Sequence, residues 1–212
     1  MKPYLFSTSS HPDTIGVNPL DISFFKPSID FSKYDYIILT SKQAVKALLQ
    51  YDYDDYKDKK ALCISNATAQ SFKQINGNVL EVGAGYGDNL SEIIIKYPKR
   101  TKWLYLRAKT VASNFAEILR RDRYDLDEAI LYESSCSENI KSVKFSKNAI
   151  LIFTSPSSVK CFLKYHEFKE NHKVIVIGKT TAKALPSQVD YLITNETSID
   201  SCLAISNSLI FK

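Results

Sequence analysis

One stretch of the sequence, Ala149-Ile150-Leu151-Ile152-Phe153-Thr154-Ser155-Pro156, joins an apolar run to a hydroxyl-rich turn. A near-continuous apolar run of this length is typical of a strand buried on both faces, as in a parallel sheet. Ser155 is a favourable helix N-cap, and Pro156 suits the first helical position. The apolar spacing between Val159 and Leu163 fits a helix there. The stretch therefore predicts a strand that leads directly into a helix.

The same alternation of strand and helix recurs along the chain. Further apolar runs predict strands, and apolar residues at helical spacing predict helices between them; the strands are expected at 36–39, 61–64, 103–106 and 174–177, and the helices at 45–49 and 111–119. Alternation of this kind indicates an α/β fold with parallel sheets. In such folds the connections are right-handed, and ligands bind at the carboxyl ends of the strands.

An internal repeat relates two halves of the chain. Ile38-Leu39-Thr40-Ser41 resembles Ile152-Phe153-Thr154-Ser155 at an offset of 114 residues, and residues 63–69 match 176–182 at an offset of 113. Two similar α/β domains are the simplest explanation. Helix N-termini from both domains would then line a cleft between them. Their free N–H groups and partial positive charge would suit a polyanion.

Composition describes an ordinary globular protein with a mild basic excess. The 212 residues are 44% hydrophobic and 24% charged, with a net charge of +5, which excludes a disordered, collagen-like or coiled-coil chain. This charge favours acidic ligands without indicating nucleic acid. No apolar run reaches about 18 residues, and the first ten residues lack a signal-peptide pattern. We expect a cytoplasmic monomer that binds a small molecule and neither nucleic acid nor membrane.

The four cysteines are far apart in the sequence: Cys63, Cys136, Cys161 and Cys202. Their spacing matches neither a zinc site nor a redox dithiol motif. We therefore expect four reduced thiols and no metal centre.

A glycine-rich segment, residues 79–87, resembles the first motif of methyltransferases that use S-adenosylmethionine. Gly83, Gly85 and Gly87 would allow the backbone to approach such a cofactor closely. In that family an acidic residue ends the next strand, whereas here that strand is followed by Arg107. The methyltransferase stays open as an alternative function. A second alternative is a two-lobed protein that binds an anion without catalysis.

Six short motifs, taken together, resemble those of uroporphyrinogen-III synthases. They lie in that family's order and spacing at residues 38–41, 65–69, 106–107, 130–132, 153–157 and 177–185. The most specific are Phe153-Thr154-Ser155-Pro156-Ser157 and Ile177-Gly178-Lys179-Thr180-Thr181. The resemblance implies two α/β domains joined by a pair of strands. One domain would take residues 1–31 plus 133–212, and the other residues 32–132.

The resemblance also implies a reaction in tetrapyrrole (heme) biosynthesis. The family closes the linear tetrapyrrole hydroxymethylbilane into uroporphyrinogen III, inverting its last pyrrole ring (ring D) and losing water, without a cofactor. This substrate carries eight carboxylates, so it is the kind of polyanion that helix N-termini in a mildly basic protein favour. Unaided closure gives the symmetric isomer I. The enzyme must therefore hold the chain in the conformation that inverts the ring.

The matching positions imply roles for eight residues. Tyr132 would be the general acid that helps the substrate hydroxyl to leave. The other seven would bind substrate carboxylates: Thr40, Ser41, Arg107, Ser155, Ser157, Thr180 and Thr181. For the hydroxyl residues, helix capping alone is an alternative role. For Arg107 the alternative is a surface salt bridge.

Overall fold

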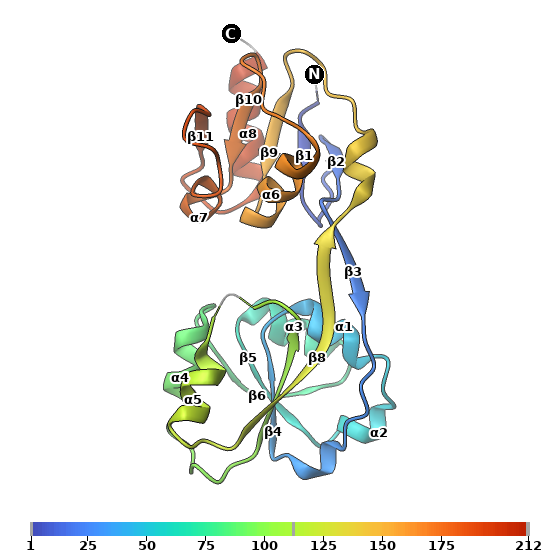
Figure 1. Ribbon diagram of the computed structural model, residues 1–212, viewed down its shortest axis with the longest axis vertical. Coiled ribbons are helices and arrows are strands. Elements are labelled where there is room, and N and C mark those ends of the chain that lie inside the picture. The colour runs from blue at the N-terminus through green and yellow to red at the C-terminus, as the bar shows by residue number, and fades with distance from the viewer. Residues whose placement is uncertain (1, 112, 211–212) are drawn as a thin grey trace. The chain divides into compact units, whose positions relative to one another are not determined.

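Two predominantly parallel sheets covered by helices form the fold of the computed structural model, which describes residues 2–111 and 113–210 (Figure 1). The chain divides into two compact units. The first combines Met1–Asp21 with Ser135–Lys212, and the second is Ile22–Ser134. Within the described residues, the helices are all too short or too polar to cross a membrane.

The first unit has a five-stranded sheet in the order β11-β10-β9-β1-β2, in which neighbouring strands are parallel. Its strands are β1 (Tyr4–Phe6), β2 (Ile15–Val17), β9 (Ile150–Phe153), β10 (Lys173–Val176) and β11 (Tyr191–Ile193); its helices are η2 (Glu138–Ser142), α6 (Pro156–Tyr165), α7 (Lys179–Ala182) and α8 (Ile199–Ile210). Alternate residues of β9 face opposite sides. Leu151 packs with Phe162 of α6, whereas Ile152 packs with Cys202 of α8. Helices thus bury both faces of this sheet.

The second unit has a six-stranded sheet in the order β3-β8-β7-β4-β5-β6. Its strands are β3 (Leu20–Phe24), β4 (Tyr36–Leu39), β5 (Lys60–Cys63), β6 (Asn78–Val82), β7 (Trp103–Ala108) and β8 (Leu126–Cys136); its helices are η1 (Phe31–Lys33), α1 (Lys42–Leu48), α2 (Tyr53–Tyr56), α3 (Asn66–Gln74), α4 (Gly87–Ile94) and α5 (Phe115–Arg121). Leu39 packs with residues of α1 and α3, and Ile38 packs with residues of α4 and α5 on the other face (Figure 1). The α/β fold with two predominantly parallel sheets is therefore confirmed.

The boundaries of the units differ from those expected from the sequence, 31/32 and 132/133. The structure places them at 21/22 and 134/135. Residues 22–31 belong to the second unit because Ile22, Ile29 and Phe31 pack in its core. The Phe25 amide also donates to the Leu131 carbonyl at 2.8 Å. Strands β3 and β8 both run from one unit into the other, as the expected pair of connecting strands.

Two other sequence predictions are wrong. The helix expected over 111–119 begins only at Phe115, and Val111 lies in the preceding loop, 37% exposed. The cysteines are not all reduced: Cys136, at the end of β8, forms a disulfide with Cys161 of α6, with their Cα atoms 5.1 Å apart. Cys63 and Cys202 form no disulfide, and both are buried.

Candidate functional site

A cavity of about 510 Å³ opens at the carboxyl edge of the second unit's sheet. Ligands of open α/β sheets bind at this edge. The cavity is lined by residues that follow or end β4, β5, β7 and β8, and by the loops before α4 and α5; they are Thr40, Ile64, Gly85, Tyr86, Gly87, Asp88, Tyr105, Ala108, Thr110, Val111, Ser113, Asn114, Phe115 and Tyr132. Tyr132 lies within β8 but is level with the end of β7, because Ala108 pairs with it. The edge therefore brings the predicted Thr40 and Tyr132 into one cavity.

Ser41 caps helix α1 and contacts Tyr132. As N-cap of α1, its Oγ accepts hydrogen bonds from the amides of Gln43 and Ala44, at 3.1 and 3.2 Å. The same Oγ lies 2.7 Å from the Tyr132 hydroxyl. A serine oxygen has two lone pairs and one proton. Two amides already donate to the Ser41 oxygen, so the Ser41 proton is available to the Tyr132 oxygen, and in the neutral pair either hydroxyl can be the donor.

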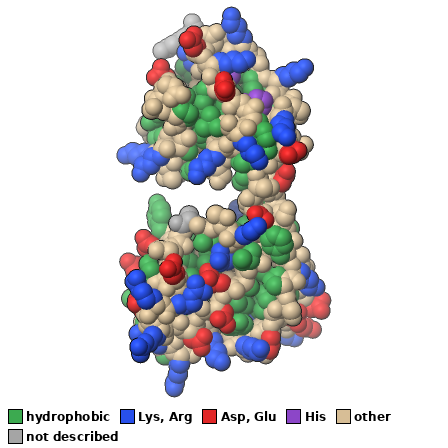
Figure 2. All heavy atoms as spheres, viewed as in Figure 1, with side chains coloured by type: hydrophobic (Ala, Val, Ile, Leu, Met, Phe, Trp, Pro, Cys, Tyr) green, Lys and Arg blue, Asp and Glu red, His purple; other side chains and the backbone are tan. Residues whose placement is uncertain are grey.

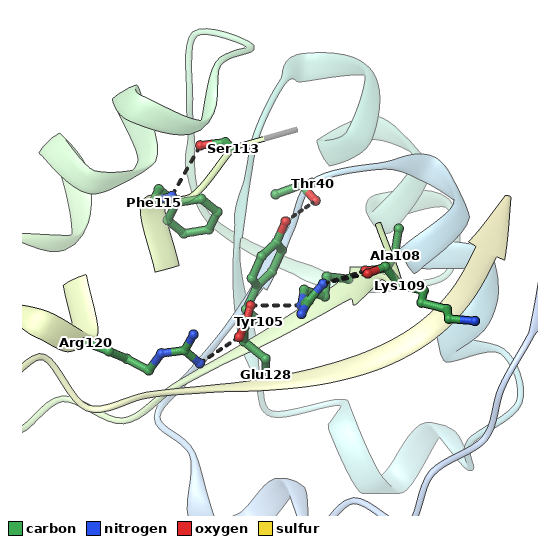
Figure 3. Close-up of polar contacts among 9 residues, drawn as sticks. Thr40, Tyr105, Ala108, Lys109, Ser113, Phe115, Arg120 and Glu128 are labelled. Carbon is green, nitrogen blue, oxygen red and sulfur yellow. Dashed lines mark hydrogen bonds and ion pairs between the residues drawn. The ribbon is translucent and has the colours of Figure 1, made fainter. Parts of the chain in front are cut away.

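Tyr105 is a site residue that the sequence analysis missed. Its hydroxyl lies 3.1 Å from Thr40 Oγ1, and its ring is 3% exposed on the wall of the cavity (Figure 3). The pairing of β4 with β7 makes this contact, since Ile38 is opposite Tyr105 and Thr40 comes two residues later. A tyrosine in an otherwise apolar strand was the available signal, because a buried phenol needs a polar partner.

Burial changes the acid–base behaviour of both phenols. Desolvation raises the pKa of Tyr132 above its ordinary value of 10.0, partly opposed by the hydrogen bond from Ser41. Desolvation likewise raises the pKa of Tyr105, partly opposed by the hydrogen bond with Thr40. Both groups are therefore neutral at physiological pH and can donate a proton or a hydrogen bond.

Arg107 makes an ion pair and hydrogen bonds with residues of the second unit. Its Nε lies 2.8 Å from Glu128 Oε1, and its Nη1 donates to the carbonyls of Ala108 and Lys109. Arg120 contacts the other oxygen of Glu128 at 2.6 Å, so one carboxylate lies between two guanidinium groups (Figure 3). The ion pair that was the alternative role of Arg107 is thus present. Binding of a substrate carboxylate by Arg107 stays a prediction.

The first unit places its predicted residues at the carboxyl ends of two adjacent strands, β9 and β10. Ser155 is the N-cap of α6 and exchanges hydrogen bonds with Ser158 in a capping box. Ser157 and Thr180 are exposed in the first turns of α6 and α7, whereas Thr181 is 3% exposed. Ser157 and Thr180 are therefore free to meet a ligand, while Thr181 faces the core.

Acidic and basic side chains are both present in each unit. Figure 2 shows acidic and basic side chains interspersed on the visible face of each unit. In the part of the chain that the structure describes, no group of three or more His, Cys, Asp or Glu residues is placed to hold a metal ion. The polar groups of the described residues that line the cavity are hydroxyls, backbone groups, the side-chain amide of Asn114 and the carboxylate of Asp88.

These features define an α/β protein of two repeated units, in which a buried tyrosine supported by a helix-capping serine faces a cavity. The sequence matches the family Uroporphyrinogen-III synthase HemD over residues 14–203, so the chain belongs to that family. It is similar to the uroporphyrinogen-III synthetase of Helicobacter pylori 26695, at 27% identity over 99% of this chain and 100% of that one, with a TM-score of 0.82.

A second solved structure supports the fold. A mutant uroporphyrinogen III synthase from the extremely thermophilic bacterium Thermus thermophilus matches with a TM-score of 0.59 and 15% identity, covering 94% of this chain and 90% of that one. Among curated proteins, none is detectably similar in sequence.

Family membership identifies the chain as an enzyme, a cyclising lyase of tetrapyrrole and heme biosynthesis. The similarities give no support to the two alternatives, the methyltransferase and the binding protein without catalysis. The glycine-rich segment 83–87 therefore needs another explanation.

Proposed function

We propose that this enzyme acts on hydroxymethylbilane and closes it to uroporphyrinogen III, with inversion of ring D and loss of water. The observation that supports this most directly is Tyr132, which lines the 510 Å³ cavity and whose hydroxyl lies 2.7 Å from Ser41 Oγ. A neutral phenol on a cavity wall can donate its proton to a leaving hydroxyl group, and Ser41 can then hydrogen-bond the phenolate that forms.

Tyr132 supplies the proton for the first step. The carbon–oxygen bond of the hydroxymethyl group breaks, the phenol proton moves to the departing oxygen, and water leaves. The pyrrole nitrogen donates electron density to the carbon, which gives a cationic azafulvene, and Tyr132 is left as a phenolate. Ser41 stabilises this phenolate, because a hydrogen bond to the charged form favours that form.

Ring closure follows and restores the tyrosine. The terminal ring attacks through its substituted carbon to form a spiro species, which reopens and recloses with the ring inverted. The proton that the new macrocycle then loses returns to the Tyr132 oxygen. Substrate and product therefore differ by one water, with no oxidant or cofactor. The enzyme's task is to orient the chain against the spontaneous closure to isomer I.

Carboxylates of the substrate are bound by hydroxyl and amide groups at the carboxyl edges of the sheets. In the second unit these are the groups at Thr40 and Ser41, with Arg107 as a further proposed ligand. In the first unit they are those of Ser155, Ser157 and Thr180, whereas Thr181, also predicted from the sequence, is buried and its amide donates to the Gly178 carbonyl. Ser157 and Thr180 are the strongest of these candidates, since both are exposed in the first turn of a helix.

Ser155 and Ser157 provide a matched pair of variants. Ser155→Ala removes the capping box of α6 and is expected to lower the free energy of unfolding by about 1 kcal/mol. Ser157→Ala is expected to leave stability nearly unchanged but to raise KM about 10-fold, the effect of one lost hydrogen bond to a charged group. Thermal melts and steady-state kinetics measure both. An unchanged KM for Ser157→Ala would remove Ser157 from the substrate site.

The proposed reaction is tested by product analysis. Hydroxymethylbilane is generated in situ, the purified protein is added, the products are oxidised, and the uroporphyrin isomers are separated by chromatography. We expect isomer III to dominate. Isomer I alone, as without enzyme, would refute the proposed function.

The setting of the enzyme is also proposed from the sequence. We infer a cytoplasmic monomer that requires neither nucleic acid nor membrane. Light scattering of the purified protein measures its mass against the 24.0 kDa of one chain. Microscopy of a fluorescent fusion tests its location.

A further inference from the structure

The glycine-rich segment forms a tightly tied loop between β6 and α4. The Gly83 amide donates to the Cys63 carbonyl and the Gly85 amide to the Ile64 carbonyl, both at 2.8 Å. Asn89 Oδ1 accepts from the Ala84 amide at 2.7 Å. These bonds join both sides of the loop to the end of β5 and to α4. The loop path is therefore fixed by backbone contacts.

Two glycines of this loop are required by geometry. Gly85 has a φ of +96°, in the left-handed region that side chains other than glycine rarely adopt. A Cβ added at Gly87 would clash with the Oγ and Cβ atoms of Ser113, so the loop approaches the segment before α5 as closely as a glycine allows. The residue between these glycines, Tyr86, thus has its backbone held on both sides.

Tyr86 carries an aromatic ring at the rim of the cavity. Tyr86 is one of the residues that line the cavity, and it is 76% exposed, the highest value among the exposed large hydrophobic residues that the structure describes. A single exposed aromatic residue on a surface is common. Here, however, a loop with two required glycines places Tyr86 on the same cavity as Tyr105 and Tyr132, the two phenols of the candidate site.

The residues that line the cavity indicate which part of a substrate it suits. Of the described residues that line the cavity, none is Lys or Arg, and Asp88 is the one with a carboxylate. Four are aromatic: Tyr86, Tyr105, Phe115 and Tyr132. Such a wall offers little to an anionic group. It suits a flat ring, and more so a ring that becomes cationic, because aromatic faces attract cations.

We propose that Tyr86 is a substrate-contacting residue whose ring packs on the face of the pyrrole that becomes the cationic azafulvene. This inference rests on the proposed function and adds to it a role for the glycine-rich loop. Carboxylates are bound by the hydroxyl and amide groups named above, of which Thr40 lies at the edge of this cavity, and the aromatic corner holds the reacting ring. Contact with the cation stabilises it and keeps the ring oriented while the spiro closure takes place.

The test compares Tyr86→Leu with Tyr86→Phe. Leu removes the aromatic face, so kcat/KM is expected to fall about 10-fold, and the share of isomer III is expected to fall as spontaneous closure competes. Phe keeps the face and is expected to retain both. Since the ring is largely exposed, neither change should move the melting temperature appreciably. Tyr191→Leu, at an exposed tyrosine of β11, is the control and should leave kinetics unchanged.

A binding measurement separates this inference from the proposed reaction. Uroporphyrin III, the oxidised product, is titrated into wild type and Tyr86→Leu by calorimetry, and weaker binding is expected for Tyr86→Leu. If wild type forms no isomer III yet binding depends on Tyr86, the reaction is wrong and the contact stands. Equal binding, with equal kinetics where turnover occurs, would overturn the role of Tyr86. Loss in Tyr86→Phe equal to that in Tyr86→Leu would also overturn it.

Discussion

The Tyr132→Phe enzyme is expected to form uroporphyrinogen III about 100-fold more slowly than wild type, the usual effect of losing a general acid. Phe has the same shape without the hydroxyl, so the leaving group loses its proton donor while the ring packing stays. Initial rates of isomer III formation, with circular dichroism to follow the fold, measure the effect. An unchanged rate would exclude Tyr132 as the proton donor.

Two comparisons make this result specific. Tyr105→Phe removes the neighbouring phenol but leaves the Tyr132 proton, so we expect a loss of only a few-fold. Ser41→Ala keeps Tyr132 but removes the hydrogen bond to it and the cap of α1; we expect an intermediate rate, together with a loss of about 1 kcal/mol of stability. If Tyr105→Phe is as slow as Tyr132→Phe, the result would contradict the assignment of Tyr132 alone as the proton donor.

The pH dependence of the reaction rate gives a further prediction about Tyr132. Because desolvation raises the pKa of Tyr132, the group is protonated, and so active as an acid, throughout the range below its ordinary value of 10.0. Ionisation of Tyr132 should therefore reduce the wild-type rate only above pH 10. The same shift affects stability: the contribution of the neutral buried phenol is fully present below pH 10 and is lost as pH rises through the folded-state pKa.

The strands β4, β5, β7, β9 and β10 were predictable because parallel strands within a sheet are buried on both faces. Residues 36–39 and 150–153 therefore read as continuous apolar runs, and the structure has strands there. β1 and β2 were not predicted, because three residues each give no periodic signal. Val111 misled the prediction of α5: it stands at helical spacing from Phe115 yet lies in the loop that lines the cavity.

The site was predictable only where local sequence determines it. Ser41 and Ser155 follow buried strands and cap helices, a role that their immediate neighbours indicate. Tyr105 meets Thr40 from 65 residues away, and only the order of strands in the sheet brings them together. Arg107 likewise meets Glu128 across the pairing of β7 with β8. Contacts between strands depend on topology, which single motifs do not contain.

The disulfide was missed for the same reason. Cys136 and Cys161 are 25 residues apart in the sequence and match no spacing rule. They meet because β8 ends beside the middle of α6, an arrangement that exists only once the first unit has folded. A disulfide is uncommon in a cytoplasmic protein. If the bond between Cys136 and Cys161 forms, the free energy of unfolding depends on whether a reductant is present.

Reduction of this disulfide is expected to lower the free energy of unfolding by about 3 kcal/mol, the entropy of closing a loop of this length in the unfolded chain. Thermal melts with and without dithiothreitol measure the loss, and Cys136→Ala/Cys161→Ala should melt at one temperature in both. Titration of thiols in denaturant without reductant should find the two of Cys63 and Cys202. Four thiols in the isolated protein, with melting unaffected by dithiothreitol, would contradict the bond and restore the reduced state that the sequence predicted.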